Sequence, residues 1–318
     1  MILEIKDLKK YFDIGGGKHV HAVDNITLNI KENEILGLVG ESGSGKSTLG
    51  KTIVGLWEKN SGEINFNGEA LPQTYRPKDY MRLSKDIQMI FQDPYSSLNP
   101  RMTVEEIIGE GLKLQKTYTR KVIREKVAWW LEKVGLDSAH MSRYPHEFSG
   151  GQRQRIGIAR AMIVEPKFVV CDEPISALDV SVQAQVIKLL EELKNSFGLT
   201  LLFIAHDLSM VRYVSDRIAV MYLGSLMEVG DADDVFFNPK HPYSQLLIKS
   251  NPIADPIREK VRQHETIKGE IPSPVNLGEA CRFVTRCPQA MEKCSKVTPN
   301  LTTLENGRQV ACFLYEEN

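Results

Sequence analysis

The stretch "EILGLVGESGSGKSTLGKTIVGLW", residues 34–57, constrains the fold of this chain more than any other part. A short apolar run ends in a glycine-rich loop, and a segment with helical character follows. Glycines let the loop backbone curl so that several N–H groups face one anion, and the following helix adds its positive N-terminal end. The stretch therefore predicts a strand, a phosphate-binding loop and a helix, in that order.

The loop sequence "GESGSGKST" matches the Walker A pattern G-x-x-x-x-G-K-[ST]. Lys46 is expected to reach the β- and γ-phosphates of a nucleotide, and the Ser47 hydroxyl is expected to hold magnesium. The whole loop is a candidate contact for ATP: Gly40, Glu41, Ser42, Gly43, Ser44, Gly45, Lys46, Ser47 and Thr48.

A second stretch, "FVVCDEP" at residues 168–174, supplies the acids that such a loop needs. An apolar strand is expected to deliver them at its carboxyl end, beside the phosphate loop. Asp172 is expected to hold magnesium through water, and Glu173 to position and polarise the attacking water. Cys171 alternates away from Asp172 and is interpreted as a small buried core thiol.

Composition favours an ordinary globular protein and predicts its compartment. The chain has 318 residues and a formal net charge of −1, so no general attraction to nucleic acid or anionic lipid is implied. Its start lacks the apolar stretch of a signal peptide, and its longest apolar runs are too short to cross a bilayer. We expect a soluble cytoplasmic protein, in which clustered cysteines bind metal more often than they pair.

The order of the motifs resembles the ATP-binding cassette (ABC) family. Residues 148–155, "FSGGQRQR", lie between the glycine-rich loop and the acidic strand, where the family has its signature motif. Ser149, Gly150 and Gly151 match that motif, and Gln152 follows it. A hydroxyl and glycine N–H groups at a helix start form a second anion site. The resemblance implies head-to-tail dimers, in which each ATP lies between one Walker A loop and the other chain's signature.

The same resemblance implies roles for further positions. Gln92 in "MIFQDP" matches the Q-loop, which contacts magnesium and the attacking water, and Asp179 ends the D-loop "SALD" at the dimer interface. His206 in "FIAHD" matches the switch histidine, a γ-phosphate contact. Family spacing points to Phe12 as the aromatic residue that stacks on adenine, with the adjacent Tyr11 as an alternative. The predicted catalytic residues are Lys46, Gln92, Glu173 and His206.

Strands that alternate with helices predict an α/β protein with a largely parallel sheet. The resemblance implies a P-loop ABC ATPase: a RecA-like parallel-sheet core, an antiparallel β subdomain and a helical subdomain. We expect the nucleotide-binding domain to span residues 1–230, with its helical subdomain at about residues 93–162. Residues 231–318 are expected to form a small cysteine-bearing C-terminal extension.

Longer stretches resemble the ATPases of oligopeptide/dipeptide importers, in particular their F-type subunit. These stretches include "DPYSSLNPRMTV", "DEPISALDVSVQAQVIKLL" and "NPKHPYSQLL". The resemblance implies an ATP-hydrolysing subunit at the cytoplasmic face of the cell membrane, attached only through its partners. Those partners are a D-type sister ATPase or a second copy, two membrane permease subunits and, indirectly, an extracellular binding protein. The surface between Gln92 and Ser149 is expected to receive the permeases' coupling helices.

Two alternatives stay open. Importers related to this family carry oligosaccharides or nickel, and the ATPase does not contact the cargo. A soluble, non-transport ABC ATPase of repair or translation is the alternative of another class, although it is expected to show a long coiled-coil insertion or two cassettes. No nucleic-acid partner is expected here.

Four cysteines near the end of the chain raise a separate question. Cys281, Cys287, Cys294 and Cys312 are spaced C-x5-C-x6-C-x17-C, without the close C-x2–4-C pairs of most zinc sites. An iron–sulfur cluster tolerates wider spacing, and the family resemblance associates this extension with [4Fe–4S] binding in some importer ATPases. The cluster is favoured; zinc, and cysteines without metal, stay open. We expect a structural role, because the extension has little apolar sequence of its own.

Overall fold

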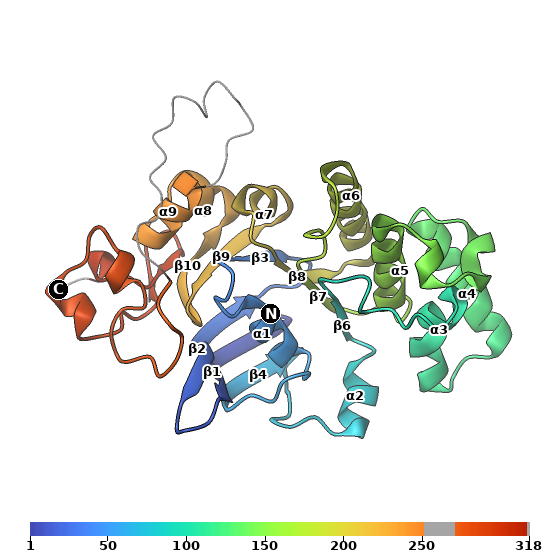
Figure 1. Ribbon diagram of the computed structural model, residues 1–318, viewed down its shortest axis with the longest axis horizontal. Coiled ribbons are helices and arrows are strands. Elements are labelled where there is room, and N and C mark those ends of the chain that lie inside the picture. Colours follow the sequence, from blue (N-terminus) through green and yellow to red (C-terminus); the bar gives the residue numbers. More distant parts are fainter. Residues whose placement is uncertain (251–270, 317–318) are drawn as a thin grey trace.

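The computed structural model describes residues 1–250 and 271–316. Two sheets form its frame (Figure 1). The smaller one is antiparallel, in the order β2-β1-β4-β5, and consists of β1 (Leu3–Asp13), β2 (His19–Ile30), β4 (Ser61–Phe66) and β5 (Glu69–Ala70). The larger one runs β11-β12-β10-β9-β3-β8-β7-β6, and consists of β3 (Ile35–Val39), β6 (Ile87–Ile90), β7 (Phe168–Asp172), β8 (Thr200–Ile204), β9 (Arg217–Tyr222), β10 (Ser225–Asp231), β11 (Thr302–Thr303) and β12 (Gln309–Val310).

The centre of the larger sheet is parallel. Strands β6, β7, β8, β3 and β9 pair in parallel. The segment "RIAVMYLGSLMEVG", residues 217–230, has the pattern of a hairpin, and it forms the antiparallel pair β9 and β10. In such a sheet the loops after the strands meet at one edge, which is where ligands bind in α/β folds. The α/β fold with a parallel core is therefore confirmed, and the phosphate loop after β3 lies beside the acids after β7.

Helices cover both faces of this sheet (Figure 1). Helix α1 (Lys46–Ile53) lies between the two sheets. Helices α6 (Val180–Phe197), α7 (Leu208–Val214), α8 (Ala232–Phe237) and α9 (Pro242–Ser250) lie on the opposite face, and α2 (Pro77–Leu83) precedes β6. Short 3₁₀ helices complete the described chain: η1 (Ser138–Ser142), η2 (Pro145–Glu147), η3 (Val284–Arg286), η4 (Glu292–Ser295) and η5 (Phe313–Tyr315).

Strand β3 shows how one short apolar run serves two cores. All five of its residues are buried. Because side chains alternate along a strand, Leu36 and Leu38 join the core around α1 and the smaller sheet. Ile35 and Val39 face the other way, into the core shared with the outer helices. A strand buried on both faces needs a continuous apolar run, and this explains the sequence that precedes the loop.

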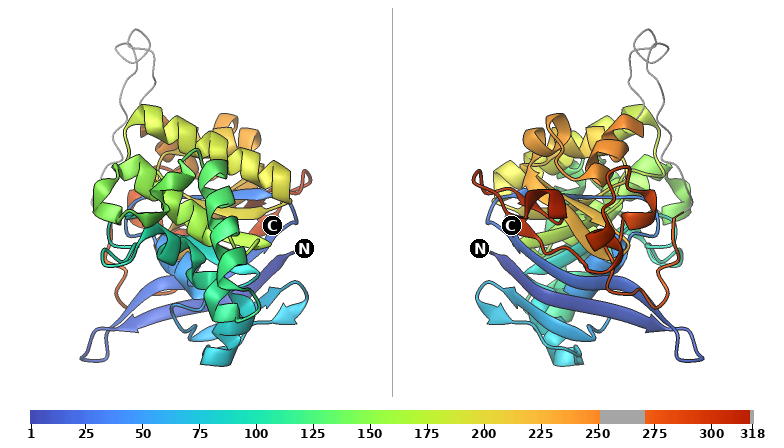
Figure 2. Two further views of the ribbon diagram at one scale, coloured as in Figure 1. Left: turned by 90° about the vertical axis from the view of Figure 1, so that its right-hand side faces the viewer. Right: turned by 90° about the vertical axis from the view of Figure 1, so that its left-hand side faces the viewer.

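Helices α3 (Val104–Gln115), α4 (Arg120–Lys133) and α5 (Gly150–Met162) form a lobe at one end of the molecule (Figure 2). Thr103 and Glu106, a pair whose spacing is typical of a helix start, form a capping box at the start of α3. Trp130 is buried in the lobe, whereas Trp129 is 44% exposed. The lobe follows β6 and Gln92, so it is attached to the core beside the candidate site.

The C-terminal extension packs against the core at the other end of the molecule (Figure 2). Strand β12 pairs with β10 and so extends the larger sheet. Near the smaller sheet, the backbone N–H of His21 donates to the carbonyl of Pro274, and that of Asn276 to the carbonyl of His19. Phe283 is fully buried in the same core as the outer helices. The extension therefore shares its hydrophobic core with the cassette.

Candidate nucleotide site

Three glycines of the phosphate loop have backbone angles that are unfavourable for a residue with a Cβ. Gly40, Gly43 and Gly45 have φ angles of 156°, 78° and 100°. A Cβ on Gly45 would lie 1.8 Å from the carbonyl oxygen of Ala22. Gly45 is also the N-cap of α1, so the first turn of that helix faces the loop without a capping side chain from this position. This geometry favours a bound phosphate.

Lys46 is held over the loop. Its ammonium donates to the carbonyls of Gly40 and Glu41 at 2.8 and 2.9 Å and to Oγ of Ser44 at 3.3 Å. The residue is only 4% exposed, and this burial lowers the pKa of Lys46, while nearby carboxylates, that of Glu173 first, oppose the shift. A buried cation inside a cradle of N–H groups is suited to a multiply charged phosphate.

Two hydrogen bonds join the loop and the strand ends. The Ser47 hydroxyl donates to Oδ1 of Asp172 at 2.6 Å, and the side-chain amide of Gln92 donates to Oε2 of Glu173 at 2.7 Å. Nδ1 of His206 lies 3.9 Å from the same Oε2. The structure thus brings together residues from the ends of β6, β7 and β8 and from the start of α1, as the sequence predicts.

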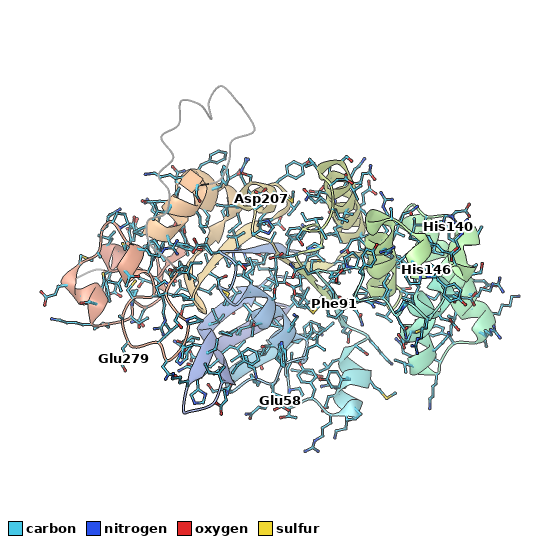
Figure 3. The ribbon with its side chains drawn as sticks, in the orientation of Figure 1. Glu58, Phe91, His140, His146, Asp207 and Glu279 are labelled. Atoms are coloured by element: carbon cyan, nitrogen blue, oxygen red, sulfur yellow. The ribbon has the colours of Figure 1, made fainter. Side chains whose placement is uncertain are left out.

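Glu173 has a particular backbone that aims its side chain. Its φ is 45°, in the left-handed region that is unfavourable for a residue with a Cβ. Its N–H donates to the carbonyl of Ile204 at 3.0 Å, so β8 fixes this turn after Asp172. Strain at such a position is typical of functional sites. Figure 3 shows Phe91 between the core and the helical lobe, next to Gln92 in the chain, and Asp207 beyond the end of β8, next to His206.

The signature segment forms a separate site. Ser149 is the N-cap of α5 and forms a reciprocal capping box with Gln152. A Cβ on Gly151 would lie 2.5 Å from a methyl group of Val182, so the signature packs closely against the segment after the D-loop. Asp179 caps the following helix, α6. Within the described residues, no hydrogen bond joins Ser149–Gln152 to Gly40–Thr48 of the same chain.

The two aromatic candidates for adenine lie in different surroundings. The Tyr11 ring stacks on His21 at 4.1 Å, and its hydroxyl donates to Asp24. Burial, reinforced by this hydrogen bond, raises the pKa of Tyr11. Phe12 meets Trp57 edge-on at 5.2 Å. Tyr11 is thus engaged through both its ring face and its hydroxyl, whereas the Phe12 ring is contacted by Trp57 and by the Lys10 ammonium, which lies 4.7 Å from the ring centroid.

The sequence gives no sign that the extension reaches the phosphate loop. Arg286 forms a two-pronged ion pair with Glu41, at 2.7 and 2.9 Å. The hydroxyl of Tyr243 accepts a hydrogen bond from the Glu41 N–H at 3.0 Å. Arginine, glutamate and tyrosine at such separations are ordinary residues, so only a residue-contact signal between distant positions could have found this group.

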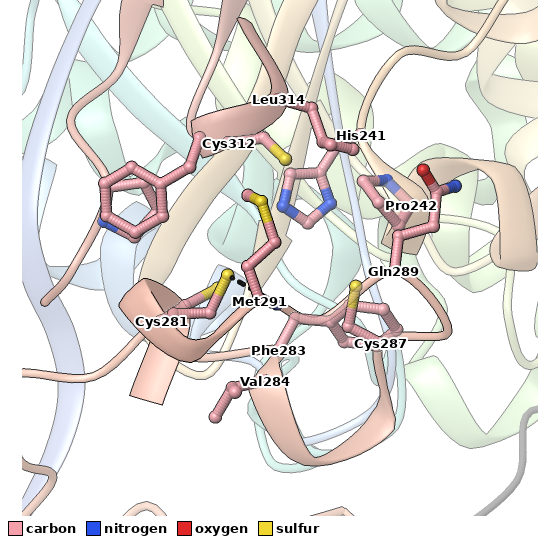
Figure 4. A pocket seen from close by; sticks show the side chains of 13 residues that line it. His241, Pro242, Cys281, Phe283, Val284, Cys287, Gln289, Met291, Cys312 and Leu314 are labelled. Carbon is pink, nitrogen blue, oxygen red and sulfur yellow. Dashed lines mark hydrogen bonds between the residues drawn. The ribbon is translucent and has the colours of Figure 1, made fainter. Parts of the chain in front are cut away.

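The four cysteines near the C-terminus line one cavity, together with His241, Phe283 and Met291 (Figure 4). All four cysteines are free thiols in the described structure. Burial, with added repulsion from the neighbouring thiols, raises the pKa of Cys281 to about 11. Among residues 1–250 and 271–316, no three His, Cys, Asp or Glu side chains are close enough to ligate a single metal ion. Neither the iron–sulfur cluster nor zinc therefore finds support in the geometry of the described residues. Cys171 is fully buried in β7, as expected.

The parallel-sheet core, the phosphate loop and the separate signature helix define an ABC-type ATPase. Comparison with protein-family models matches residues 23–176 to the ABC transporter family, and residues 227–294 to the C-terminal region of oligopeptide/dipeptide transporters. The chain therefore belongs to the ABC transporter ATP-binding proteins, and within them to the oligopeptide-transport group of the OppF type. The family prediction is confirmed.

Individual relatives support this assignment along almost the whole chain. OppF, an oligopeptide transport ATP-binding protein of Escherichia coli, is 50% identical over 95% of this chain and 92% of its own length. AppF of Bacillus subtilis is 48% identical over 99% and 97% of the two chains. Both relatives are named as ATP-binding proteins of oligopeptide transport.

Solved structures agree with the fold. The dimeric, post-hydrolysis ATP-binding cassette MJ0796 with bound ADP and phosphate has a TM-score of 0.67 and 27% identity, covering 72% of this chain and 98% of that one. CbiO1 of Clostridium perfringens, part of an ABC transporter complex, has a TM-score of 0.66 and 30% identity, covering 74% and 91%. None of the helices in the described ranges has the length and apolar character to span a bilayer.

Proposed function

We propose that this chain hydrolyses ATP to drive a membrane importer of oligopeptides or dipeptides. The observation that carries the proposal is the near-complete match to oligopeptide-transport ATP-binding proteins, at 50% and 48% identity. The site is consistent with it, because the residues that hydrolysis requires already contact one another across the loop and the strand ends.

The chain's own residues support phosphoryl transfer to water. Lys46 and the loop N–H groups hold the β- and γ-phosphates and stabilise the charge that develops there. Glu173 orients and polarises the attacking water, and His206 contacts the γ-phosphate. Gln92 holds the Glu173 carboxylate in place. These roles rest on matching motif positions and on the contacts described above.

Magnesium is implied by this chemistry, and the residues present fit it. The Ser47 hydroxyl and the Asp172 carboxylate lie 2.6 Å apart beside the phosphate loop, and the Gln92 side chain is hydrogen-bonded to Glu173, the residue after Asp172. Oxygen donors of this kind are those that magnesium prefers. The ion would supply charge neutralisation at the β- and γ-phosphates.

A second cassette completes the nucleotide site. In this chain the signature at Ser149–Gln152 lies on the helical lobe, away from its own Walker A loop. A head-to-tail dimer brings the partner's signature onto the bound phosphates. We propose a D-type sister ATPase as the partner, with a homodimer of this chain as the alternative.

An exposed apolar groove supports attachment to membrane subunits. It lies between the core and the helical lobe, next to Gln92, and Met81 and Leu114 in it are 57% and 64% exposed. Apolar side chains that line it include Val54, Leu56, Tyr80, Met81, Phe91 and Leu114. We propose that the permease coupling helices dock here, which places the chain peripherally on the cytoplasmic face of the cell membrane.

Copurification tests the function. A tagged full-length chain should bring down two polytopic membrane proteins and a sister ATPase from detergent extracts. Recovery of ribosomes or nucleic acid instead would support the soluble, non-transport alternative. In the reconstituted complex, ATP hydrolysis stimulated by a peptide-loaded binding protein supports peptide cargo. Stimulation by oligosaccharide or nickel in place of peptide would show that the importer is of a related type.

We further propose that residues 231–318 form an extension distinct from a nucleotide-binding domain at 1–230, whose helical part covers about residues 93–162. The separate lobe of α3 to α5 and the cysteine cavity support this division.

For the extension we propose a [4Fe–4S] cluster held by Cys281, Cys287, Cys294 and Cys312. The support is that all four thiols border one largely apolar cavity although they are far apart in sequence. A cluster presents four iron corners and so reaches thiols that are too widely spaced for one ion. Anaerobically purified protein should be brown and contain about four irons per chain. Colourless protein that contains neither iron nor sulfide would refute the proposal.

A further inference from the structure

The phosphate loop carries an acidic residue that is held from outside the cassette. Glu41 is the second residue of the Walker A motif, and a free carboxylate there would repel the phosphates of ATP. Its charge reaches the functional lysine, because burial lowers the pKa of Lys46 and the Glu41 carboxylate, after those of Glu173 and Asp172, opposes that shift. Something must therefore neutralise Glu41 if the loop is to bind ATP tightly.

The C-terminal extension supplies that neutralising group. Arg286 donates from Nη1 to one oxygen of Glu41 at 2.7 Å and from Nη2 to the other at 2.9 Å. The Arg286 side chain is 4% exposed and that of Glu41 is 20% exposed, so the pair is shielded from solvent. Arginine suits such a two-pronged contact because its planar fork matches a carboxylate.

The residues around Arg286 hold the Walker A loop in position, in addition to the neutralisation of the Glu41 charge by Arg286. Nη1 of Arg286 also donates to the hydroxyl of Tyr222 at 2.9 Å, at the end of β9. Tyr243, which is fully buried, accepts the backbone N–H of Glu41. The rings of Tyr222, Tyr243 and Phe283 pack on one another with centroids 4.6 to 5.4 Å apart. The contact is therefore built from α9, β9 and η3 together.

The same short segment forms a wall of the cysteine cavity. Arg286 is the last residue of η3 and directly precedes Cys287, and the segment begins after Cys281. The N–H of Val284 donates to the carbonyl of Cys281, and the N–H of Cys281 to the carbonyl of Cys294. One peptide bond therefore separates Arg286 from Cys287, a thiol of the cysteine cavity.

We propose that Arg286 and Tyr243 are positioning residues for ATP binding, and that the state of the cysteine cavity adjusts nucleotide affinity through Arg286. Arg286 neutralises Glu41, and Tyr243 fixes the Glu41 backbone, so the extension sets both the charge and the shape of the Walker A loop. This coupling holds whichever group the thiols bind, and it does not depend on the cargo of the importer.

A double-mutant cycle tests whether Arg286 supports ATP binding by neutralising Glu41. In the purified full-length chain with magnesium, Arg286→Gln should weaken binding of a fluorescent ATP analogue about tenfold, a change of about 1.4 kcal/mol. In the Glu41→Gln background the same substitution should weaken binding less than about twofold, because the charge to be neutralised is gone. Arg286→Lys should recover part of the affinity. Equal losses in both backgrounds, or no loss in either, would overturn the proposal.

A matched control separates positioning from a folding defect. Lys293→Gln removes another ion pair of the extension, with Glu316, and should leave ATP binding unchanged. In the assembled complex, Arg286→Gln should raise KM for ATP while kcat stays within about twofold, since Arg286 contacts no reacting atom. A fall in kcat with unchanged KM, or a loss of ATP binding in Lys293→Gln as well, would point to general disruption and count against the proposal.

A second double-mutant comparison tests whether the cysteine cavity acts on ATP affinity through Arg286. Cys287→Ala should weaken ATP binding in the unmutated chain but cause no further loss in Arg286→Gln. If Cys287→Ala weakens binding equally in both backgrounds, the cavity does not act through Arg286. Because these assays measure nucleotide binding by the chain alone, they stay informative even if the cargo is not a peptide.

Discussion

The side-chain amide of Gln92 donates to Oε2 of Glu173 at 2.7 Å, which links the segment that enters the helical lobe to the carboxylate that we propose activates water. The same oxygen lies 3.9 Å from Nδ1 of His206. A displacement of the lobe would therefore act on the carboxylate that we propose orients the water. This contact offers a physical route by which the proposed docking of a membrane subunit in the adjacent groove would control hydrolysis.

Glu173→Gln should abolish hydrolysis and keep ATP binding. The substitution removes the acceptor of the water proton and preserves the size of the side chain, so we expect a loss of about 10²–10⁴-fold in phosphate release. Trapped ATP should hold the cassettes in a closed dimer, seen as an earlier peak in gel filtration with ATP. Hydrolysis at the unmutated rate would show that Glu173 is not the activating residue.

Phe12→Ala should weaken ATP binding about tenfold, because it removes the proposed stacking surface for adenine. Phe12→Trp, which retains an aromatic face, should bind nearly as well as the unmutated chain. Titration with a fluorescent ATP analogue measures both variants.

Tyr11→Phe is the comparison that separates the two aromatic candidates. It removes only the hydroxyl that donates to Asp24, and should lower the free energy of unfolding by about 1 kcal/mol without weakening ATP binding. If Tyr11→Ala weakens ATP binding and Phe12→Ala does not, Tyr11 is the stacking residue.

Gly45→Ala should destroy the phosphate loop. The added Cβ would lie 1.8 Å from the backbone oxygen of Ala22, and the φ of 100° is unfavourable for alanine. We expect loss of measurable ATP binding and a stability loss of at least about 1–3 kcal/mol. Gly43→Ala is the matched control, since open space surrounds its Cβ and only the φ of 78° opposes it. Equal ATP binding by the two variants would show that the contact with Ala22 does not matter.

The features that sequence predicts well are those built by neighbouring residues. The loop at Gly40–Thr48 requires glycine, lysine and a hydroxyl at fixed spacing, so the strand, loop and helix can be recognised from the sequence. The capping box at Thr103 and Glu106 is equally local. The meeting of Gln92, Glu173 and His206 is predictable because the carboxyl ends of parallel strands share one edge.

Features that depend on the packing of distant segments are not predictable in this way. The two-residue strands β11 and β12 are too short for a periodic pattern, so the extension of the sheet to β10 leaves no trace in the sequence. Helix α4 shows a smaller difference. The apolar spacing in "TRKVIREKVAWWLEKVG", residues 119–135, predicts Val122 on the buried face, but in the structure Ile123 is buried there with Val127 and Trp130. A shift of one position on a helix lies within the width of an apolar stripe.

Asp24→Asn tests how firmly the extension is tied to the smaller sheet. Asp24 accepts from the Tyr11 hydroxyl and pairs with Arg282, and the two ionic side chains are 7% and 10% exposed. Burial alone would raise the pKa of Asp24, but the Tyr11 hydrogen bond and the Arg282 charge, together with His21, outweigh it and lower the pKa. The variant leaves a buried arginine unpaired, and we expect the free energy of unfolding, measured with denaturant at neutral pH, to fall by about 3 kcal/mol.

The pH dependence of stability tests the charge of Asp24. Because its native pKa lies below the unfolded value, this stabilisation is present above about pH 4 and is lost as pH falls through the native pKa. The stability curves of the variant and the unmutated chain should therefore converge as the pH falls below the native pKa of Asp24. A constant difference between them at every pH would show that the Asp24 carboxylate charge does not stabilise the fold.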